Sequence, residues 1–211
     1  MKVLSVLLVC GFLAGFVPGI VPAISPLVTE HEDLHQGVTK DCGDGKTFTK
    51  LGASWKTFPV TYHIAASGDN AAAITRAFAT FEAQEHPKGP FFSQQGSSGQ
   101  NIDVSFAPID GPSGVLARTS YSYYRQTKAF VEVNIVFDSA ENWANYAGIF
   151  CGSQGSGIDV EAVATHELGH GVGCGHSSSS TALTMYPYYS SGATHQRTLA
   201  TGDAKCVDAL Y

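Results

Sequence analysis

The stretch HELGHGVGCGH at residues 166–176 constrains this chain more than any other part of its sequence. His166 and His170 are four residues apart, so on a helix they project from one face. His176 comes six residues later and would lie about 9 Å further along if the helix continued. It can join the other two only if the helix ends first, and Gly173 can take the left-handed conformation that ends it. The sequence therefore predicts a helix, a turn at Gly173 and three converging histidines.

Three converging imidazoles suit a zinc ion. Neutral imidazole binds zinc at about 2.0 Å, and three protein ligands leave the fourth tetrahedral position for water. Bound zinc lowers the pKa of that water toward ~7. Glu167, next to His166, is placed to take the proton of the water and pass it to a leaving amine. The expected reaction is hydrolysis of a peptide bond; a purely structural three-histidine site is the alternative, and it would leave Glu167 without a role.

The length, charge and N-terminus predict a single exported domain. At 211 residues the chain has room for one domain with appendages, and its net charge of −6 argues against a nucleic-acid-binding surface, which needs a basic face. Lys2 followed by the apolar run 3–17 is typical of a secretory signal. We expect residues 1–24 to be a signal peptide and the protein to be a secreted monomer without a stable membrane partner. A membrane anchor formed by the N-terminal apolar segment is the alternative.

The four cysteines outside this signal segment predict two disulfides, since an even number in an exported chain usually pairs. Three connectivities are possible. We prefer Cys42–Cys206, which ties the two ends of the domain together. Cys151–Cys174 would then hold the segment before the histidine helix to the far end of that helix.

Periodicity predicts an α+β domain with one sheet and a few helices packed on it. Residues 25–53 are polar with little periodicity and form a short propeptide or leader, so we expect regular structure to begin near residue 58. Asp69 opens an amphipathic helix, Asp159 caps the histidine helix, and residues 201–211 form a closing helix. The expected strands are 58–64, 101–107, 115–119 and 128–137, with a tyrosine-rich connection between the last two.

The histidine stretch matches H-E-x-x-H-x-x-G-x-x-H, the metzincin signature, and Met185 in LTMYP is similar to the methionine turn of that clan. Other segments resemble the matrixin branch, the matrix metalloproteinases and their microbial relatives; they are SWKTFPVTYHI, DGPSGVLA and VFDSAENW. The resemblance covers residues 54–211. It implies a metzincin-like zincin, with a mixed twisted sheet, an active-site helix, a methionine turn and a C-terminal helix.

The resemblance also implies roles for particular residues. His166, His170 and His176 would bind the catalytic zinc, Glu167 would be the general base and acid, and Met185 would form the floor of the site. A protein or peptide substrate would add as an extended strand to edge strand 115–118. The pocket for the side chain after the cut bond would involve Leu116, Ala117, Tyr186, Pro187 and Tyr188.

A structural calcium site is implied as well. Its acidic ligands would be Asp110, Asp138 and Glu141, and its main-chain carbonyls would come from Gly111, Ser113 and Val115. The alternative is a polar loop whose acids face water. Arg118 and Val136 stand where matrixins carry histidines for a second, structural zinc, so only the catalytic zinc is expected.

Two questions stay open from the sequence. Asp41-Cys42-Gly43-Asp44 is weakly similar to a cysteine switch, in which a thiolate occupies the open zinc position, but it lacks the flanking Pro-Arg. Side chains of the leader could block the metal instead; they are His31, Glu32, Asp33 and His35. The alternative to an enzyme is an exported binding module that keeps a metzincin scaffold without turnover, and the intact Glu167 argues against it.

Overall fold

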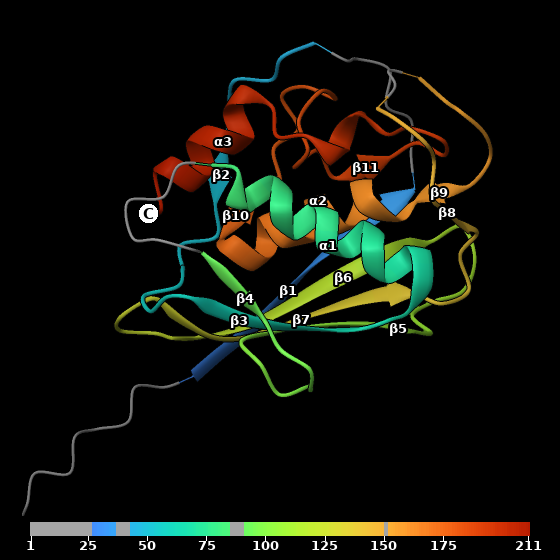
Figure 1. Ribbon diagram of the computed structural model, residues 1–211. Coiled ribbons are helices and arrows are strands. Elements are labelled where there is room, and N and C mark those ends of the chain that lie inside the picture. Colours follow the sequence, from blue (N-terminus) through green and yellow to red (C-terminus); the bar gives the residue numbers. More distant parts are fainter. Residues whose placement is uncertain (1–26, 37–42, 85–90, 150–151) are drawn as a thin grey trace, which may run out of the picture.

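A seven-stranded mixed sheet forms the base of the molecule in the computed structural model, which describes residues 27–36, 43–84, 91–149 and 152–211 (Figure 1). The strand order is β11-β1-β6-β7-β5-β3-β4. Strands β3, β4, β5 and β7 run parallel, β6 is antiparallel to β7, and β1 is antiparallel to β6. The strands are β1 (Leu27–Gln36), β3 (Val60–Ala65), β4 (Phe92–Gln94), β5 (Ile102–Ala107), β6 (Val115–Tyr124), β7 (Ala129–Asp138) and β11 (Tyr188–Tyr189).

Two helices lie side by side on one face of this sheet, α1 (Gly68–Glu82) and α2 (Val160–Val172), as Figure 1 shows. The short helices η1 (His195–Arg197) and α3 (Thr201–Asp208) follow. Two small ladders complete the fold, β2 (Thr49–Lys50) with β10 (Cys174–Gly175) and β8 (Trp143–Ala144) with β9 (Ile158–Asp159). The predicted α+β class, with one sheet and a C-terminal helix, is confirmed.

Helix α2 lies at the centre of the molecule, and all of its residues are buried. It contacts α1 along one side, the sheet strands β1, β6 and β7 below it, and η1, so protein surrounds it. Asp159 caps its start by accepting a hydrogen bond from the Ala162 backbone N–H at 2.9 Å, as predicted. An ion pair ties it to α1, because Arg76 Nε lies 2.6 Å from Glu161 Oε2. A helix held on every side is a rigid support for the side chains it carries.

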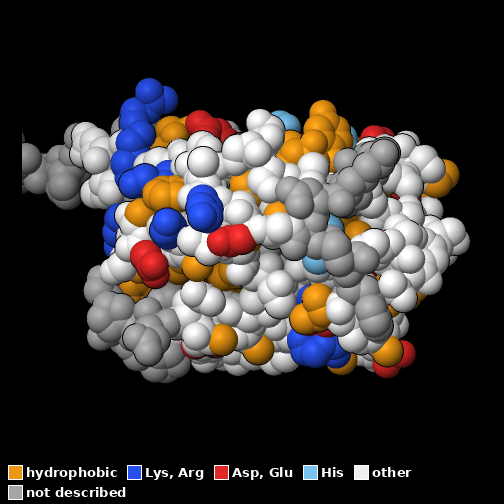
Figure 2. Space-filling model, turned by 90° about the horizontal axis from the view of Figure 1, so that it is seen from above, with side chains coloured by type: hydrophobic (Ala, Val, Ile, Leu, Met, Phe, Trp, Pro, Cys, Tyr) orange, Lys and Arg blue, Asp and Glu red, His pale blue; other side chains and the backbone are white. Residues whose placement is uncertain are grey.

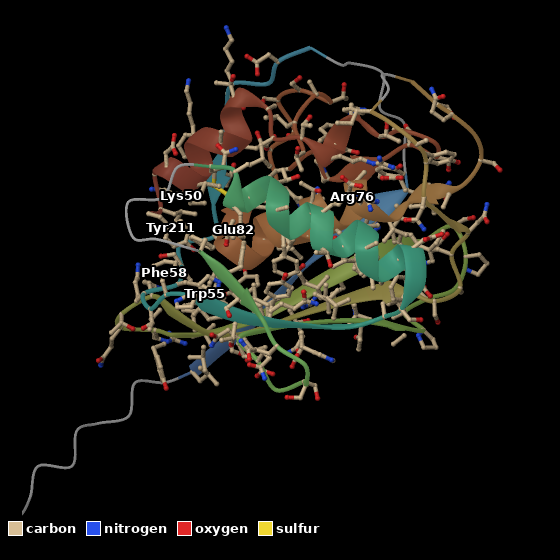
Figure 3. The ribbon with its side chains drawn as sticks, in the orientation of Figure 1. Lys50, Trp55, Phe58, Arg76, Glu82 and Tyr211 are labelled. Carbon is tan, nitrogen blue, oxygen red and sulfur yellow. A yellow bond between two sulfur atoms is a disulfide. The ribbon has the colours of Figure 1, made fainter. Side chains whose placement is uncertain are left out.

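Aromatic side chains fix the C-terminal end of α2, and Figure 3 shows Trp55, Phe58 and Tyr211 close together there. The Trp55 Nε1–H donates to the Gly171 carbonyl at 2.8 Å, and the Tyr211 hydroxyl donates to the Val172 carbonyl at 2.6 Å. These carbonyls belong to the last turn of the helix, which has no partners for them within the helix. Trp55 and Tyr211, which lie far apart in the sequence, therefore hold the point where the chain turns.

The helix-bearing side of the molecule appears in Figure 2. Hydrophobic side chains lie there in small dispersed groups, and most of the visible Lys and Arg side chains gather toward one end. Within the described residues, no helix is both long enough and apolar enough to cross a membrane. The expected signal segment, residues 1–24, lies outside the described part of the chain.

The structure departs from the expected elements in three places. Among the described residues, regular structure begins at β1 rather than near residue 58, and β6 continues through Tyr121 and Tyr123, which were expected in a connection. The closing helix α3 ends at Asp208 rather than at Tyr211. Only Leu34 is fully buried in β1, so the apolar alternation that marks a strand in sequence is missing. A strand joined to a sheet by its backbone does not require such alternation.

The predicted disulfides are wrong. Cys174 and Cys206 pair with each other, with their Cα atoms 6.0 Å apart, so neither Cys42–Cys206 nor Cys151–Cys174 can form. The turn at Gly173 directs Cys174 toward α3, which packs against β10. The bond therefore links the end of the histidine helix to the closing helix. Cys42 and Cys151 lie outside the described residues, so the cysteine of the weak cysteine-switch similarity does too.

Candidate zinc site

The structure brings the three histidines together. Helix α2 presents His166 and His170, and it ends at Gly173, whose φ of 105° is left-handed. A Cβ atom at Gly173 would lie 2.4 Å from the Ala53 carbonyl oxygen, so both the conformation and the space require glycine. The chain turns back and places His176 beside the other two. The three Nε2 atoms lie 3.1 Å from one another.

The other ring nitrogens fix how these imidazoles are oriented. His166 Nδ1 lies 2.6 Å from the Thr184 carbonyl oxygen, and His170 Nδ1 lies 2.8 Å from the Cys174 carbonyl oxygen. A carbonyl can only accept, so both Nδ1 atoms carry the hydrogen and both Nε2 atoms present lone pairs. His176 Nδ1 lies 3.3 Å from Glu32 Oε2. Each Nδ1 atom thus has an oxygen partner, and the partner of the third comes from β1.

This arrangement fits a zinc ion. Lone pairs that face one another at 3.1 Å repel unless a cation lies between them. Two nitrogens that bind one tetrahedral zinc ion at about 2.05 Å lie about 3.3 Å apart, close to the observed spacing. Across the part of the chain that the structure describes, these histidines form the one cluster of at least three metal-ligating side chains.

Burial keeps the three imidazoles neutral. It lowers the pKa of His170 to about 3 and that of His176 to about 4, and it lowers the pKa of His166 well below the ordinary value. The neighbouring imidazoles add to the effect on His166 and His170, since a second positive charge there would be repelled. All three are therefore available as ligands at neutral pH.

The Glu167 carboxyl is fully buried next to the first histidine. Its Oε2 atom accepts a hydrogen bond from the Thr119 hydroxyl at 2.5 Å, and its Oε1 atom has no hydrogen-bond partner among the described residues. Burial raises the pKa of Glu167 to about 8, against the opposing effect of the Thr119 hydrogen bond. A dication at the histidines would favour the ionised form. A buried oxygen without a partner can accept a proton from a molecule at the site.

Met185 lies beneath α2, where a glycine makes room for it. A Cβ atom at Gly169 would come 2.1 Å from Met185 Sδ, so this close approach accounts for a glycine within the helix. At Gly171 the nearest atom would be 3.7 Å away, which is ordinary contact, so no steric requirement for glycine exists there. The Met185 carbonyl accepts a hydrogen bond from the Ser177 N–H at 2.9 Å and so joins this turn to the segment after His176.

An acid from α3 holds that turn in place. Asp203 accepts hydrogen bonds from the Thr184 and Met185 N–H groups at 2.8 and 3.2 Å. Thr184 in turn offers its carbonyl to His166, so the closing helix reaches the metal cluster through one turn. The sequence analysis missed Asp203 and Thr119. Thr119 could have been predicted as a hydrogen-bonding residue, because a buried hydroxyl on the inward face of a strand requires a partner.

The predicted substrate edge is not an edge in this structure, because β1 lies along it. β1 runs between β6 and β11, antiparallel to β6 and parallel to β11. Leu34 lies opposite Ala117, and the pairing shifts at Leu116, so that His35 lies opposite Val115. Tyr186, Pro187 and Tyr188, the predicted pocket wall, lie on the other side of β1. The His35 N–H donates to the Pro187 carbonyl at 3.3 Å, and His35 pairs with Tyr188 in the ladder between β1 and β11. The rings of Tyr186 and Tyr188 contact each other.

The predicted calcium residues form a hydrogen-bonded loop. Asp138 Oδ2 accepts from the N–H groups of Asp110 and Gly111 at 3.0 and 3.1 Å, and Glu141 Oε1 accepts from the Ser113 N–H at 2.6 Å. Asp110 accepts from the Val115 N–H at 3.1 Å. Burial raises the pKa of Asp138, but its backbone donors outweigh this effect and lower it. The carboxylates therefore bind the loop backbone.

Comparison with known proteins agrees with this geometry. The matrixin family model, peptidase family M10, matches residues 50–211. The chain belongs to the matrixin family.

Three curated relatives show how far the similarity extends. Matrilysin of Felis catus is 37% identical over 106 residues, which cover 50% of this chain and 36% of matrilysin. Karilysin of Tannerella forsythia is 38% identical over 104 residues, 49% of this chain and 19% of karilysin. Human neutrophil collagenase is 32% identical over 105 residues, 50% of this chain and 20% of that protein. The chain thus aligns with about a third or less of the length of these relatives.

Proposed function

We propose that this protein is a secreted zinc-dependent endopeptidase. The observation that carries the proposal is the convergence of three Nε2 lone pairs 3.1 Å apart beside a buried carboxylate oxygen without a partner. Membership of a peptidase family supports it. The N-terminal signal segment supports secretion. We retain the proposed organisation of signal peptide 1–24, leader 25–53 and catalytic domain 54–211.

In this proposal the histidines hold one zinc ion, which supplies Lewis-acid chemistry and lowers the pKa of bound water. Glu167 takes a proton from water at its Oε1 atom and delivers it to the leaving amine. Thr119 holds the other carboxylate oxygen and so positions the base. Met185 and the turn that contains it support His166 from below.

The substrate would be a protein or peptide chain in extended conformation. Once β1 has left, the backbone of β6 is open to strand addition along residues 115–118. Pro187 and its tyrosine neighbours would form the opposite wall, and Leu116 with Ala117 would line the β6 side. Leu34, on the strand between β6 and β11, is fully buried in the hydrophobic core. A substrate in the register of β1 would therefore place an aliphatic side chain in the groove between β6 and β11.

A structural calcium ion remains part of the proposal. The loop of residues 110–115 is held by the carboxylates of Asp110, Asp138 and Glu141, and carboxylate and carbonyl oxygens are the ligands that calcium prefers. We also retain the expectation of a monomer.

Casein cleavage with and without a zinc chelator tests the function. It is measured for the full chain and for a chain with Leu34→Asp, which places a charge in a buried position and opens the groove. We expect chelator-sensitive cleavage that Glu167→Gln lowers by about 10²- to 10⁴-fold without loss of zinc. Glu132→Gln, the same change at an exposed position on β7, should leave cleavage unchanged. Absence of chelator-sensitive cleavage in the opened chain, or full cleavage by Glu167→Gln, would refute the proposal.

A further inference from the structure

The acidic side chains of β1 each contact a polar group of the catalytic domain. Asp33 accepts two hydrogen bonds from Arg118, Nε to Oδ1 at 2.5 Å and Nη2 to Oδ2 at 2.9 Å. Glu30 accepts from the hydroxyls of Tyr121 and Tyr123 at 3.0 and 3.2 Å. With Glu32 near His176, three acids of one short segment therefore have partners across the groove.

Arg118 makes the most specific of these contacts. It lies directly opposite Asp33 in the ladder between β1 and β6, and its planar guanidinium donates two hydrogen bonds to the carboxylate, one to each oxygen. Such a pair distinguishes a carboxylate from neutral and basic groups by geometry as well as by charge. A lysine opposite Arg118 would bring two cations together.

The next residue of β1 lies deepest in the groove. Alternation along the strand points Leu34 to the opposite face from Asp33, and Leu34 is fully buried. A segment in this register therefore presents an acid to Arg118 immediately before an aliphatic residue that the groove encloses. Further toward its N-terminus it presents a second acid, Glu30, to two buried tyrosines.

We propose that β1 shows the substrate class of the groove: extended peptides with an acidic residue immediately before the enclosed aliphatic residue, selected by Arg118. This rests on the proposed function. Arg118 is a specificity-determining residue in this account, and the leader is the first ligand of the groove. The tyrosine pair adds a preference for a second acid at the Glu30 position.

Amide hydrogen exchange tests the recognition without any turnover. All chains in this experiment are full length and carry Glu167→Gln. The reference chain is compared with three variants that carry in addition Asp33→Arg, Arg118→Asp, or both changes. We expect either single change to speed exchange of the β1 amides paired with β6 by about 5- to 30-fold, and the double change to restore protection within about 3-fold. Arg125→Asp, the same charge change in the exposed turn after β6, should have little effect on residues 31–35.

Unchanged protection in both single variants would overturn the proposal. So would a double variant that exchanges as fast as the single variants, because a general loss of folding stability would not be reversed by exchanging the charges.

Peptide cleavage by the full chain opened with Leu34→Asp tests the substrate class. Two peptides are compared by kcat/KM. They are identical except that one has Asp and the other Lys immediately before a leucine. The leader competes equally with both peptides, so its effect cancels in the ratio of the two kcat/KM values. We expect the Asp peptide to be favoured about 10-fold, and Arg118→Asp to abolish or reverse this preference. A ratio near one, or a ratio that Arg118→Asp does not change, would overturn the proposal. If neither peptide is cut, the proposed function fails, while the exchange experiment still decides the recognition.

Discussion

Two regions of this molecule carry residues that were predicted to bind metals, and their donor atoms are used differently. In the histidine cluster the Nδ1 atoms have oxygen partners, and the Nε2 lone pairs face one another. In the loop of residues 110–115 the carboxylates of Asp110, Asp138 and Glu141 accept backbone N–H groups. Among the described residues, the Nε2 lone pairs of the first region have no hydrogen-bond donor, whereas the carboxylates of the second region accept backbone N–H groups.

The difference shows what makes a metal site recognisable in a structure. Converging lone pairs without hydrogens between them are unfavourable unless a cation joins them, so the histidine cluster implies an ion by its geometry. Carboxylates that hold a loop are favourable without an ion. We therefore expect the folded state to depend on a bound cation more strongly in the first region than in the second.

The largest expected effect is on the pH dependence of the free energy of unfolding, which should differ between the histidine cluster and the loop of residues 110–115. In the metal-free chain the lowered pKa values of the three histidines contribute stability above pH 6.5, which is lost as the pH falls through about 4 for His176 and about 3 for His170. Glu167 acts in the opposite direction, because its raised pKa contributes stability that is lost as the pH rises from 4.5 to about 8. Between pH 6 and pH 5 the unfolded chain binds about three more protons at the histidines than the folded chain, and about one fewer at Glu167. The net difference of about two protons should lower the free energy of unfolding by about 3 kcal/mol over this pH unit.

Urea denaturation of the chelated chain at several pH values measures this slope. Glu167→Gln should steepen it, since the opposing carboxyl is gone. The pKa of Asp138 is lowered from 3.8, so the stability that its ionised form contributes is lost only below that pH. A metal-free chain of constant stability from pH 7 to pH 5 would contradict the contrast between the two regions.

The next effect concerns the loop alone. Asp138→Ala removes the acceptor of three backbone N–H groups, those of Asp110, Gly111 and Ala140, and should lower the free energy of unfolding by about 3 kcal/mol. Zinc content should not change. Thermal unfolding and metal analysis of the same sample check both points. Loss of zinc from this variant would show that the two regions are coupled.

The smallest effect lies within α2. Gly171→Ala should stabilise the chain by up to about 1 kcal/mol, because alanine favours helix and the added methyl group finds ordinary contacts. Gly169→Ala should destabilise it, because the methyl group would collide with the Met185 sulfur. Paired urea titrations compare the two variants. Equal effects of both changes would mean that Met185 does not fix the position of the helix.

Sequence predicted the histidine site well because its information is local. The spacing of His166 and His170 and the glycine at 173 determine the turn without knowledge of the rest of the fold. The partners of that site could not be predicted in the same way. Asp203 and Thr119 come from other elements, and only the packing of α3 and β6 brings them to α2.

The leader and the disulfide show a second limit. β1 is held by backbone pairing and polar contacts, so its sequence carries no strand periodicity. The pairing of Cys174 with Cys206 depends on where α3 packs, and the sequence places no restriction on that. Both departures arose from long-range contacts, whereas the predicted elements 101–107 and 128–137, which have clear alternation, were confirmed.

X-ray absorption spectroscopy at the zinc edge of the purified full chain tests the central claim most directly. The account predicts one zinc per chain with three imidazole nitrogens and one oxygen at about 2.0 Å, and loss of this signature in His176→Ala. Absence of stoichiometric zinc, or a sulfur ligand at about 2.3 Å, would contradict it.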